Sequence, residues 1–401
     1  MGFNYQSPIH YILHIRQQPQ VCQTNTAGLA ENLFYHYCHC HNHDKMRQQV
    51  GCRAPKDKGR FVLDHAASQG DTVAAATDAI KTLSKLVKSD MDAVNACLLE
   101  RMQSDVPLIP ELAGYLIAAG GKRIRPLLTL ASARLCGYEG ANHVQFAASV
   151  EFIHTATLLH DDVVDESELR RGRQTANRVW NNQASVLVGD FLYSRSFQLM
   201  VEQGNMECLR ILADASAIIA GGEVLQLSIQ NDLSTSEDAY MNVIRAKTAA
   251  LFAAACEVGG AVGAIDQKHQ AALRSYGENL GIAFQLVDDA LDYKADETAL
   301  GKTIGDDFAE GKITLPVLLA YAAGDAAECA FWKRAIEDKE QSGGDLQQAQ
   351  RLIERHKAIE QTVLRAQHFG KRAKGALAGF PESTLRQAML DVVDFTIARG
   401  H

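Results

Sequence analysis

The sequence predicts an all-α fold, a helical bundle around a central cavity, and three observations carry this prediction. From about residue 72 onward, apolar side chains recur with a period near 3.6 in long segments rich in Ala and Leu. Only Pro316 lies between Pro126 and Pro381, so long helices can run without interruption. Alternating β-branched runs bounded by turn residues, which are typical of strands, are missing. We therefore expect about ten or more helices in one domain.

Composition sets the broad class of the protein. The 401 residues are 47% hydrophobic and 22% charged, as in a soluble globular protein, and the net charge of −8 argues against a nucleic-acid partner. The most apolar stretch, Thr248–Cys256, is too short to span a membrane. An apolar substrate or product could still bring the protein to a membrane surface transiently. Nine cysteines without a paired framework fit a reducing compartment, so we expect a cytoplasmic protein.

Residues 1–74 differ from the rest and are expected to form a poorly ordered extension, with the helical domain at 75–401. The extension is rich in Gln, His, Asn and Cys and lacks a sustained apolar period. The segment Tyr37–His43, which alternates Cys and His, suggests zinc, but its spacing is too tight for the usual ligand patterns, which favours an incidental tail. The extension matches neither a secretory signal nor a transit peptide, and a native start nearer Met46 is an alternative.

Within the domain, each periodic segment predicts one helix. In order, these segments are Asp78–Met102, Glu111–Ala119, Leu127–Cys136, Asn142–His160, Ala184–Glu202, Cys208–Ile229, Ala239–Gly260 and Gln267–Leu291.

Two of these helices run into the same acidic pattern. Asp161 and Asp165 are four residues apart, so on a helix they share one face, about 6 Å apart along the axis. Burying crowded acids without a partner costs several kcal/mol, and a hard divalent metal ion is the natural partner. A second copy of the pattern follows 127 residues later, from Asp288 to Asp292. The two helices should face each other across the cavity. The candidate metal ligands are Asp161, Asp162, Asp165, Asp288, Asp289 and Asp292.

Cations accompany both acidic patterns. The segment Gly120–Pro126 opens a helix after two glycines and carries three cations in four positions, where free backbone N–H groups favour an anion. Lys122 and Arg125 could converge on one phosphate, although a solvated basic turn is the simpler local interpretation. The further cations are Arg170, Arg171, Lys247, Lys302 and Lys312. Cations interleaved with metal-binding acids suit a diphosphate. An ion-pair network without metal is the alternative.

From about residue 78 to the end, the sequence resembles the trans-prenyltransferases, also called polyprenyl diphosphate synthases. The resemblance rests on several motifs together: Asp161–Arg173, Gly281–Asp292, Gly120–Pro126, Lys247-Thr248 and the loop from Gly301 to Lys312. The segments Glu151–Asp162 and Gly222–Leu227 are most similar to long-chain octaprenyl-type members. The first 75 or so residues lie outside the resemblance.

The resemblance implies an isoprenoid-synthase fold, a homodimer and three Mg²⁺ ions. By this analogy Asp161 and Asp165 hold two ions and Asp288 the third. The allylic diphosphate would be gripped by Arg170, Lys247 and Lys302, and isopentenyl diphosphate by Lys122, Arg125, His154 and Arg171. Lys312, Thr248 and Gln285 complete the predicted substrate-binding set. The predicted catalytic residues are Asp161, Asp165, Lys247, Gln285 and Asp288.

His154 is on an apolar helix, where a lone histidine is more often a core residue than a ligand. It lies seven residues, about two turns, before Asp161 and so faces the same cavity, which favours a ligand.

The implied chemistry is ionisation of the allylic diphosphate, followed by attack of the isopentenyl double bond on the carbocation. Dipoles of Gln285 and Thr248 can stabilise the cation. No side chain is obviously placed as a general base, so the released diphosphate is a candidate proton acceptor. Glu166 and Glu223 are expected to have supporting or structural roles.

Product length should depend on the helix before Asp161. Ala156 and Thr157, five and four residues earlier, are small, and Phe152 lies a turn farther. We expect a tunnel that admits a product of about C40, by resemblance, for the side chain of a quinone such as ubiquinone. The alternatives are a shorter, geranylgeranyl-type synthase, a class I terpene cyclase, or a non-catalytic subunit of a heteromeric synthase.

Overall fold

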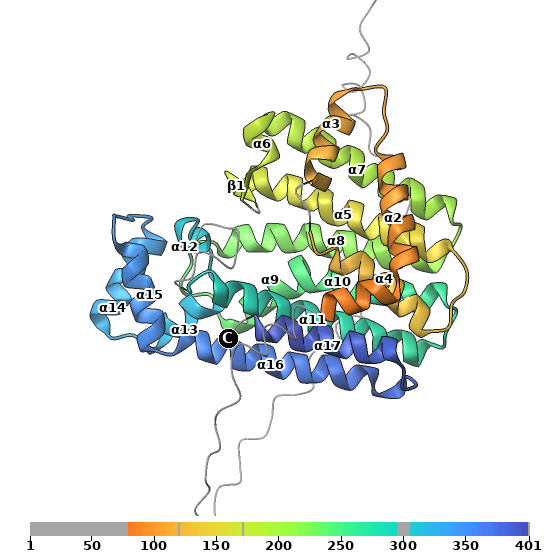
Figure 1. The fold of residues 1–401 in the computed structure, drawn as a ribbon. Helices are drawn as coiled ribbons and strands as arrows, with labels where there is room; N and C mark the ends of the chain where they lie inside the picture. Colours follow the sequence, from red (N-terminus) through yellow and green to blue (C-terminus); the bar gives the residue numbers. More distant parts are fainter. Residues whose placement is uncertain (1–78, 119–120, 171, 295–304, 400–401) are drawn as a thin grey trace, which may run out of the picture. The chain divides into compact units, whose positions relative to one another are not determined.

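The computed structural model describes residues 79–118, 121–170, 172–294 and 305–399 (Figure 1). The Cys- and His-rich segment at 37–43, Arg171 and Lys302 lie outside the described residues, and the predicted division at residue 74 stays a prediction.

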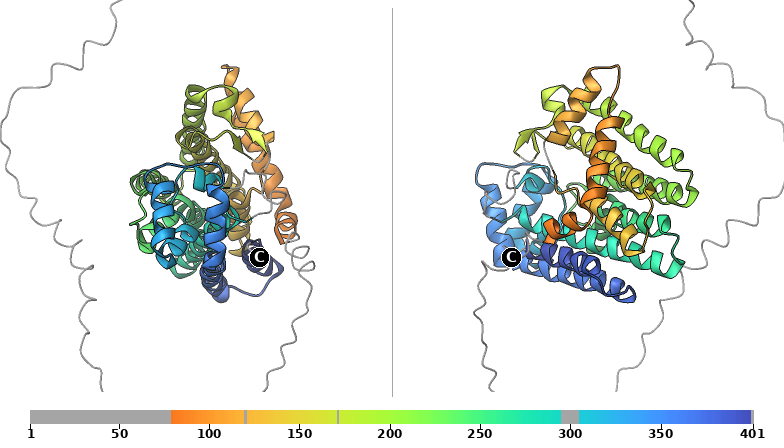
Figure 2. Two further views of the ribbon diagram at one scale, coloured as in Figure 1. Left: turned by 90° about the vertical axis from the view of Figure 1, so that its left-hand side faces the viewer. Right: turned by 45° about the vertical axis from the view of Figure 1, so that its right-hand side comes forward.

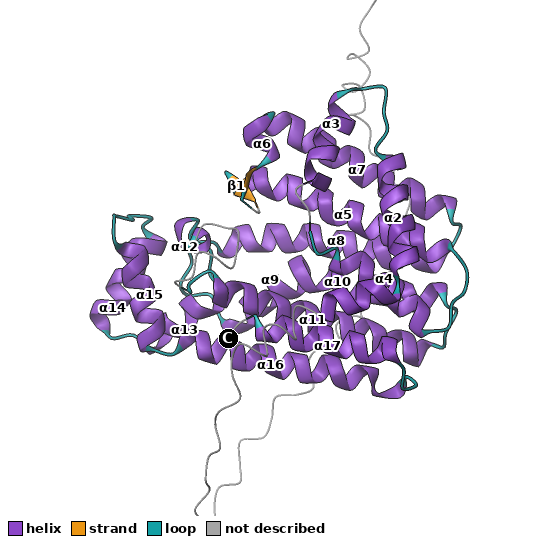
Figure 3. Ribbon diagram, viewed as in Figure 1, coloured by secondary structure: helices purple, strands orange, loops and turns teal. Residues whose placement is uncertain are grey.

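The described chain is almost wholly helical, as predicted (Figure 3). Its helices, with π and 3₁₀ turns marked η, are α2 (Lys88–Arg101), α3 (Leu108–Ala118), α4 (Ile124–Leu135), α5 (Asn142–Val164), α6 (Ala176–Val179), α7 (Asn182–Glu202), α8 (Met206–Ile229), α9 (Glu237–Ile244), η2 (Arg245–Ala249), α10 (Ala250–Val262), α11 (Gln267–Leu291), α12 (Asp306–Ala309), α13 (Leu315–Ala323), α14 (Ala326–Trp332), η3 (Lys333–Glu337), α15 (Asp345–Arg355), α16 (Ala358–Ala376), η4 (Leu377–Gly379) and α17 (Thr384–Ala398). The strands β1 (Leu169–Arg170) and β2 (Arg173–Gln174) form a short antiparallel pair.

Two predicted helices differ in detail from the structure. The segment predicted at Asp78–Met102 turns at Val87, so 79–86 and α2 are separate helices. The segment predicted at Ala239–Gly260 is interrupted by the π turn η2. Apolar periodicity did not reveal either interruption, because buried side chains continue on both sides of each one.

Helices α5 and α11 carry the two acidic motifs and lie within the bundle (Figures 1 and 2). Helix α5 packs against α2, α4 and α7, and α11 packs against α10, α16 and η2. Each of the two ends at its acidic motif, with Asp165 and Asp292 as the residues that follow the last helical turn. The C-terminal end of a helix is the negative end of its dipole, so these positions increase the demand for a cation.

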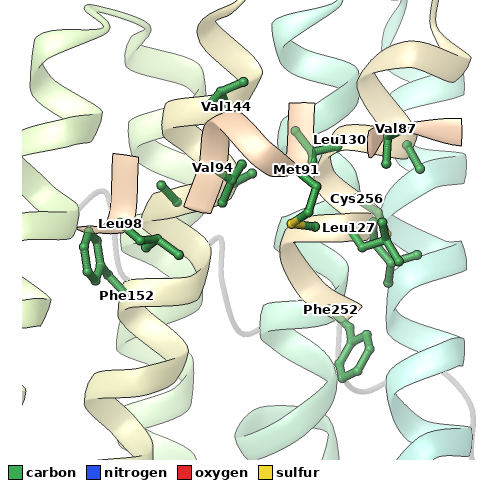
Figure 4. Close-up of a cluster of buried hydrophobic side chains, with 14 of the residues drawn as sticks. Val87, Met91, Val94, Leu98, Leu127, Leu130, Val144, Phe152, Phe252 and Cys256 are labelled. Atoms are coloured by element: carbon green, nitrogen blue, oxygen red, sulfur yellow. The ribbon is translucent and has the colours of Figure 1, made fainter. Parts of the chain in front are cut away.

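A buried hydrophobic cluster holds the helices around α5 in place (Figure 4). Val94 and Leu98 of α2, Leu127 of α4, Phe152 of α5 and Phe252 of α10 are all nearly or fully inaccessible. Burial of such side chains stabilises the fold by about 1.5–3 kcal/mol each. The acidic ends of α5 and α11 thus extend from a rigid scaffold. In the described part of the chain, no helix is both long and apolar enough to cross a membrane.

Candidate active site

One cavity of about 660 Å³ brings the two acidic motifs together, as predicted. Asp161 and Asp165 line it from the end of α5, and Asp288, Asp289 and Asp292 line it from the end of α11. The cavity is also lined by predicted cations and polar residues: Lys122, Arg125, His154, Thr157, Arg170, Lys247, Thr248, Gln285 and Lys312.

The first motif is electrostatically crowded. Lys247 Nζ lies 3.9 Å from Asp161 Oδ2 and 2.6 Å from Glu223 Oε2. Burial raises the pKa of Asp161 to about 7; the Lys247 ammonium lowers it, while Glu223 and Asp165 raise it. The Arg170 guanidinium lowers this pKa as well, but burial and the neighbouring carboxylates outweigh both cations, so the site favours a further cation.

Asp162 differs from its neighbours in orientation. Its side chain is buried at 1% exposure, and Arg170 donates to its Oδ1 through Nε at 2.8 Å, with Nη2 2.7 Å away. Asp162 lines a smaller adjoining cavity instead of the main one, whereas Arg170 lines both. This geometry favours a role for Asp162 in orienting Arg170, and its predicted role as a metal ligand stays a prediction.

The second motif contains a hydrogen-bonded chain that ends at Asp289. Thr248 Oγ1 donates to Gln285 Oε1 at 2.7 Å, and Gln285 Nε2 donates to Asp289 Oδ1 at 2.7 Å. Tyr240 Oη donates to Asp289 Oδ2 at 2.5 Å. Burial raises the pKa of Asp289 to about 7, Asp307 raises it too, and the hydrogen bonds from Tyr240 and Gln285 lower it. Asp289 therefore holds Gln285 and, through it, Thr248 in one orientation.

The other two acids of this motif meet partners that sequence reasoning missed. Arg399 Nη2, just beyond α17, lies 3.4 Å from Asp288 Oδ1, with its guanidinium 5.1 Å from the Phe284 ring centre. The backbone N–H of Asp307 donates to Asp292 Oδ2 at 3.1 Å. Arg399 and Tyr240 belong to no sequence pattern that singles them out, so only the fold reveals them.

A basic wall faces the acids from the start of α4. The helix begins at Ile124, as the predicted helix opening requires, and Arg123 before it has a left-handed backbone with φ 44°. Arg125 Nη1 lies 3.2 Å from His154 Nε2, and the guanidinium stacks 4.4 Å from the Phe252 ring centre. His154 thus lines the cavity beside a cation, which supports a ligand role over a purely structural one.

Lys122 belongs to the same wall and is partly held by an aromatic ring. Its Nζ lies 4.6 Å from the ring centre of Phe395 on α17. Burial lowers the pKa of Lys122, and the Arg399 guanidinium lowers it further.

Lys312 joins the segment after α12 to the first acidic motif. Its Nζ donates to Asp165 Oδ2 at 3.0 Å, pairs closely with Glu310 and lies 3.9 Å from Asp307 Oδ1. Burial lowers the pKa of Lys312, but these three carboxylates outweigh burial and raise the pKa above its ordinary value. Lys312 therefore stays charged at neutral pH.

The predicted chain-length residues occupy different environments. Thr157 lines the cavity, and its hydroxyl donates to the His154 carbonyl at 2.9 Å. Ala156 and Phe152 are buried in the hydrophobic cluster at 0% and 2% exposure. Of the two expected supporting acids, Glu223 lines the cavity, while Glu166 is exposed with a left-handed backbone.

The donor set fits a divalent metal ion that is shared with a substrate. Carboxylate oxygens are the ligands that Mg²⁺ prefers, and it is usually held by one or two carboxylates together with substrate phosphates. Among the residues that the structure describes, no three acidic, His or Cys side chains form a ready-made metal cluster. Asp161, Asp165 and Asp288, spread around one cavity, match the shared mode of binding.

Comparison with known proteins identifies the family. A family model described as polyprenyl synthetase matches residues 106–353. The octaprenyl diphosphate synthase of Haemophilus influenzae is 46% identical over 325 residues, covering 80% of this chain and 98% of that relative. The octaprenyl diphosphate synthase of Escherichia coli is 44% identical over 323 residues, covering 80% and 99%.

Solved structures agree with this family. A decaprenyl diphosphate synthase from Rhodobacter capsulatus has a TM-score of 0.78 at 55% identity, covering 80% of this chain and 99% of that one. A polyprenyl synthase from Caulobacter crescentus, solved with calcium and isoprenyl diphosphate, has a TM-score of 0.78 at 52% identity, covering 80% and 97%. Both the predicted family and the predicted fold class are therefore confirmed: this chain belongs to the polyprenyl synthetase family, with the all-α isoprenoid-synthase fold.

Proposed function

We propose that this enzyme adds isopentenyl diphosphate repeatedly to an allylic diphosphate of farnesyl type and releases an all-trans product of about C40. The observation that carries the proposal is that one cavity is lined both by cations near Asp161 and by cations at the start of α4. Lys247 and Arg170 lie near Asp161, while Lys122 and Arg125 form a second group, with His154 beside Arg125. Two groups of cations suit two diphosphates, whereas a terpene cyclase needs only one such site.

The chain's own residues would bind and orient both substrates. Lys247 and Arg170 neutralise the allylic diphosphate, together with Lys302 as the resemblance implies. Lys122, Arg125 and His154, with Arg171 by the same resemblance, hold isopentenyl diphosphate so that its double bond approaches the allylic carbon. Asp161, Asp165 and Asp288 would hold three Mg²⁺ ions. When bound, Mg²⁺ supplies positive charge that stabilises the departing diphosphate.

The carbocation formed by ionisation also needs dipoles beside it. Thr248 and Gln285 line the cavity, and their hydrogen bonds to each other and to Asp289 fix their orientation before reaction. Fixed dipoles cost no reorganisation as charge develops, which makes them effective. The proton lost after condensation is assigned to the released diphosphate.

Product analysis tests the proposal. The protein is incubated with farnesyl diphosphate, labelled isopentenyl diphosphate and Mg²⁺, and the dephosphorylated products are separated by chromatography. A ladder that ends near C40 supports the proposal. A product that stops at C20 supports the shorter-chain alternative, a cyclised product supports a cyclase, and no turnover supports a silent subunit.

We also propose that the enzyme is a homodimer formed through α8. Between Asp214 and Glu223 this helix has no charged residue. Its outer face exposes large apolar side chains, including Ile218 at 45% and Val224 at 67%. Leu187, on the neighbouring helix α7, is exposed at 66%. Exposed large apolar side chains gathered on neighbouring helices are typical of obligate interfaces.

Sedimentation velocity tests the dimer. Wild type should sediment as a dimer, and Ile218→Glu should shift it toward monomer. Leu364→Glu, at a side chain exposed at 62% on α16, should leave the dimer intact. A monomeric wild type, or equal behaviour of the two variants, contradicts this interface.

We assign the cytoplasm as the site of action. The product would serve as a quinone side chain, in ubiquinone by resemblance, with transient contact at the membrane surface during release.

A further inference from the structure

The π turn η2 carries Lys247, which lies near Asp161, and Thr248, which is linked through Gln285 to Asp289. In η2 the backbone N–H of Ala250 donates to the Arg245 carbonyl five residues back, so the turn holds one more residue than an α turn. Lys247 and Thr248 are on this turn, and both line the cavity. Their positions therefore depend on how the π turn packs against the neighbouring helices α8 and α11.

Helix α8 approaches this turn too closely for any side chain. A Cβ atom at Gly222 would lie 2.7 Å from Ala246 Cβ and 2.9 Å from Lys247 N. The second of these is a backbone atom, which cannot swing aside as a flexible side chain can. Glu223, the next residue, binds Lys247 Nζ at 2.6 Å. The close approach at Gly222 thus also sets this ion pair.

Helix α11 makes a similar approach to the same turn. A Cβ atom at Gly281 would lie 2.7 Å from Ala249 Cα and 3.1 Å from Ala249 Cβ. Both α8 and α11 pack against η2. Neither Gly222 nor Gly281 has a positive φ, so these positions need glycine for space and not for backbone conformation.

We propose that Gly222 and Gly281 are positioning residues that seat the π turn and thereby place Lys247 and Thr248 against the allylic diphosphate. The proposal rests on the proposed function for the identity of that substrate. Neither glycine lines the cavity. They act by letting two helix backbones close on the turn.

A matched pair of substitutions on α8 tests this role. Gly222→Ala adds a methyl group against the turn, whereas Gly221→Ala adds the same group where nothing lies within 4 Å. Both gain helix propensity equally. Gly222→Ala should lower kcat/KM for farnesyl diphosphate about tenfold to a hundredfold, the scale of a displacement near 1 Å. The KM for isopentenyl diphosphate should change little, and the melting temperature should fall by only a few degrees, because one overpacked methyl group costs a modest amount of stability. Gly221→Ala should remain close to wild type.

Two further variants separate positioning from other effects. Because Gly221 lies on the exposed face of α8, where the dimer is proposed to form, sedimentation velocity checks the oligomeric state of each variant. Gly375→Ala on α16, where an added Cβ atom also meets nothing within 4 Å, serves as a second control. Ala246→Gly removes the methyl group that the new one would meet. The double variant Gly222→Ala/Ala246→Gly should therefore regain part of the lost kcat/KM. Such a rescue identifies the contact between residues 222 and 246 as the cause of the loss, and melting temperatures of the single and double variants show how much of the loss follows stability.

Equal kcat/KM for Gly222→Ala and Gly221→Ala in an active enzyme overturns the proposal and leaves the proposed function intact. If the wild-type protein does not elongate farnesyl diphosphate, the proposed function fails. Amide hydrogen exchange at residues 245–250 then still tests whether Gly222 holds the π turn in place. Faster exchange in Gly222→Ala than in Gly221→Ala supports this role, and equal exchange overturns it.

Discussion

Asp161 and Asp289 show that burial alone does not define a residue's role. The pKa of each carboxyl group is raised to about 7 by burial. Asp289 receives hydrogen bonds from Tyr240 and Gln285 on both oxygens, which suits an orienting role. Lys247 Nζ lies 3.9 Å from Asp161 Oδ2 but pairs more closely with Glu223. The electrostatic cost at Asp161 is what a bound cation would relieve.

Asp161→Asn should therefore lower activity but raise stability when metal is removed. In the folded protein the pKa of Asp161 is about 7, above its ordinary value, so the folded state binds more protons than the unfolded state between about pH 4 and 7. The free energy of unfolding then falls as pH rises, by up to about 1.4 kcal/mol per pH unit from this group. Urea unfolding in EDTA from pH 5.5 to 8 should show a shallower fall in Asp161→Asn.

Activity with Mg²⁺ should drop about a hundredfold or more in the same variant. Asp92→Asn, at an exposed helix ion pair, should match wild type in both measurements. An unchanged pH slope in Asp161→Asn would contradict the electrostatic account of this acid.

Tyr240→Phe tests the orienting role of Asp289. The variant removes one donor from a fully buried carboxylate, which should lower the free energy of unfolding by about 1–3 kcal/mol. Tyr115→Phe removes an exposed hydroxyl bond to the Gln174 carbonyl and should cost less than about 0.5 kcal/mol. Equal losses in urea titrations of the two variants would argue against a special contact at Asp289.

At the scale of elements, the sequence predicted what periodicity and charge can specify. The acid-ended helices are predicted to share a cavity because metal sites in helical bundles lie between facing helices, and α5 and α11 do line one cavity. The turn at Val87 and the π turn at Lys247 were missed. Apolar spacing along one segment does not reveal the extra residue of a π turn. The glycines on α8 and α11 that pack against η2 are the only sign of it in the sequence.

Helix α5 is also predicted to set product length. Ala156→Phe places a large ring in the buried cluster beside Thr157, which should block the growing chain and shorten the product toward C20 or C25. Overpacking a well-packed core typically costs about 1–3 kcal/mol, and more for a change as large as Ala to Phe. Ala148→Phe, at a fully buried alanine of the same helix, should therefore destabilise the protein similarly and leave product length unchanged. Products of unchanged length from Ala156→Phe would contradict the predicted tunnel.

At the scale of the whole molecule, separate parts of the chain converge on one site. Arg399, from the end of the described chain, lies beside Asp288, and Lys312 joins the segment after α12 to Asp165 on α5. The acidic and basic motifs could be predicted because the functional residues of each lie within a few positions of the sequence. The contributions of Arg399 and Tyr240 could not, because a lone arginine or tyrosine gains its role only from the fold that places it.

The acidic ends of α5 and α11 are proposed to bind divalent metal ions together with an allylic diphosphate. Anomalous diffraction from crystals grown with Mn²⁺ and an unreactive thiodiphosphate analogue of farnesyl diphosphate tests it most directly. Anomalous peaks are expected beside Asp161 and Asp165 and beside Asp288, with the diphosphate between them and within reach of Lys247. Absence of these peaks, or an analogue bound only at Lys122 and Arg125, would contradict it.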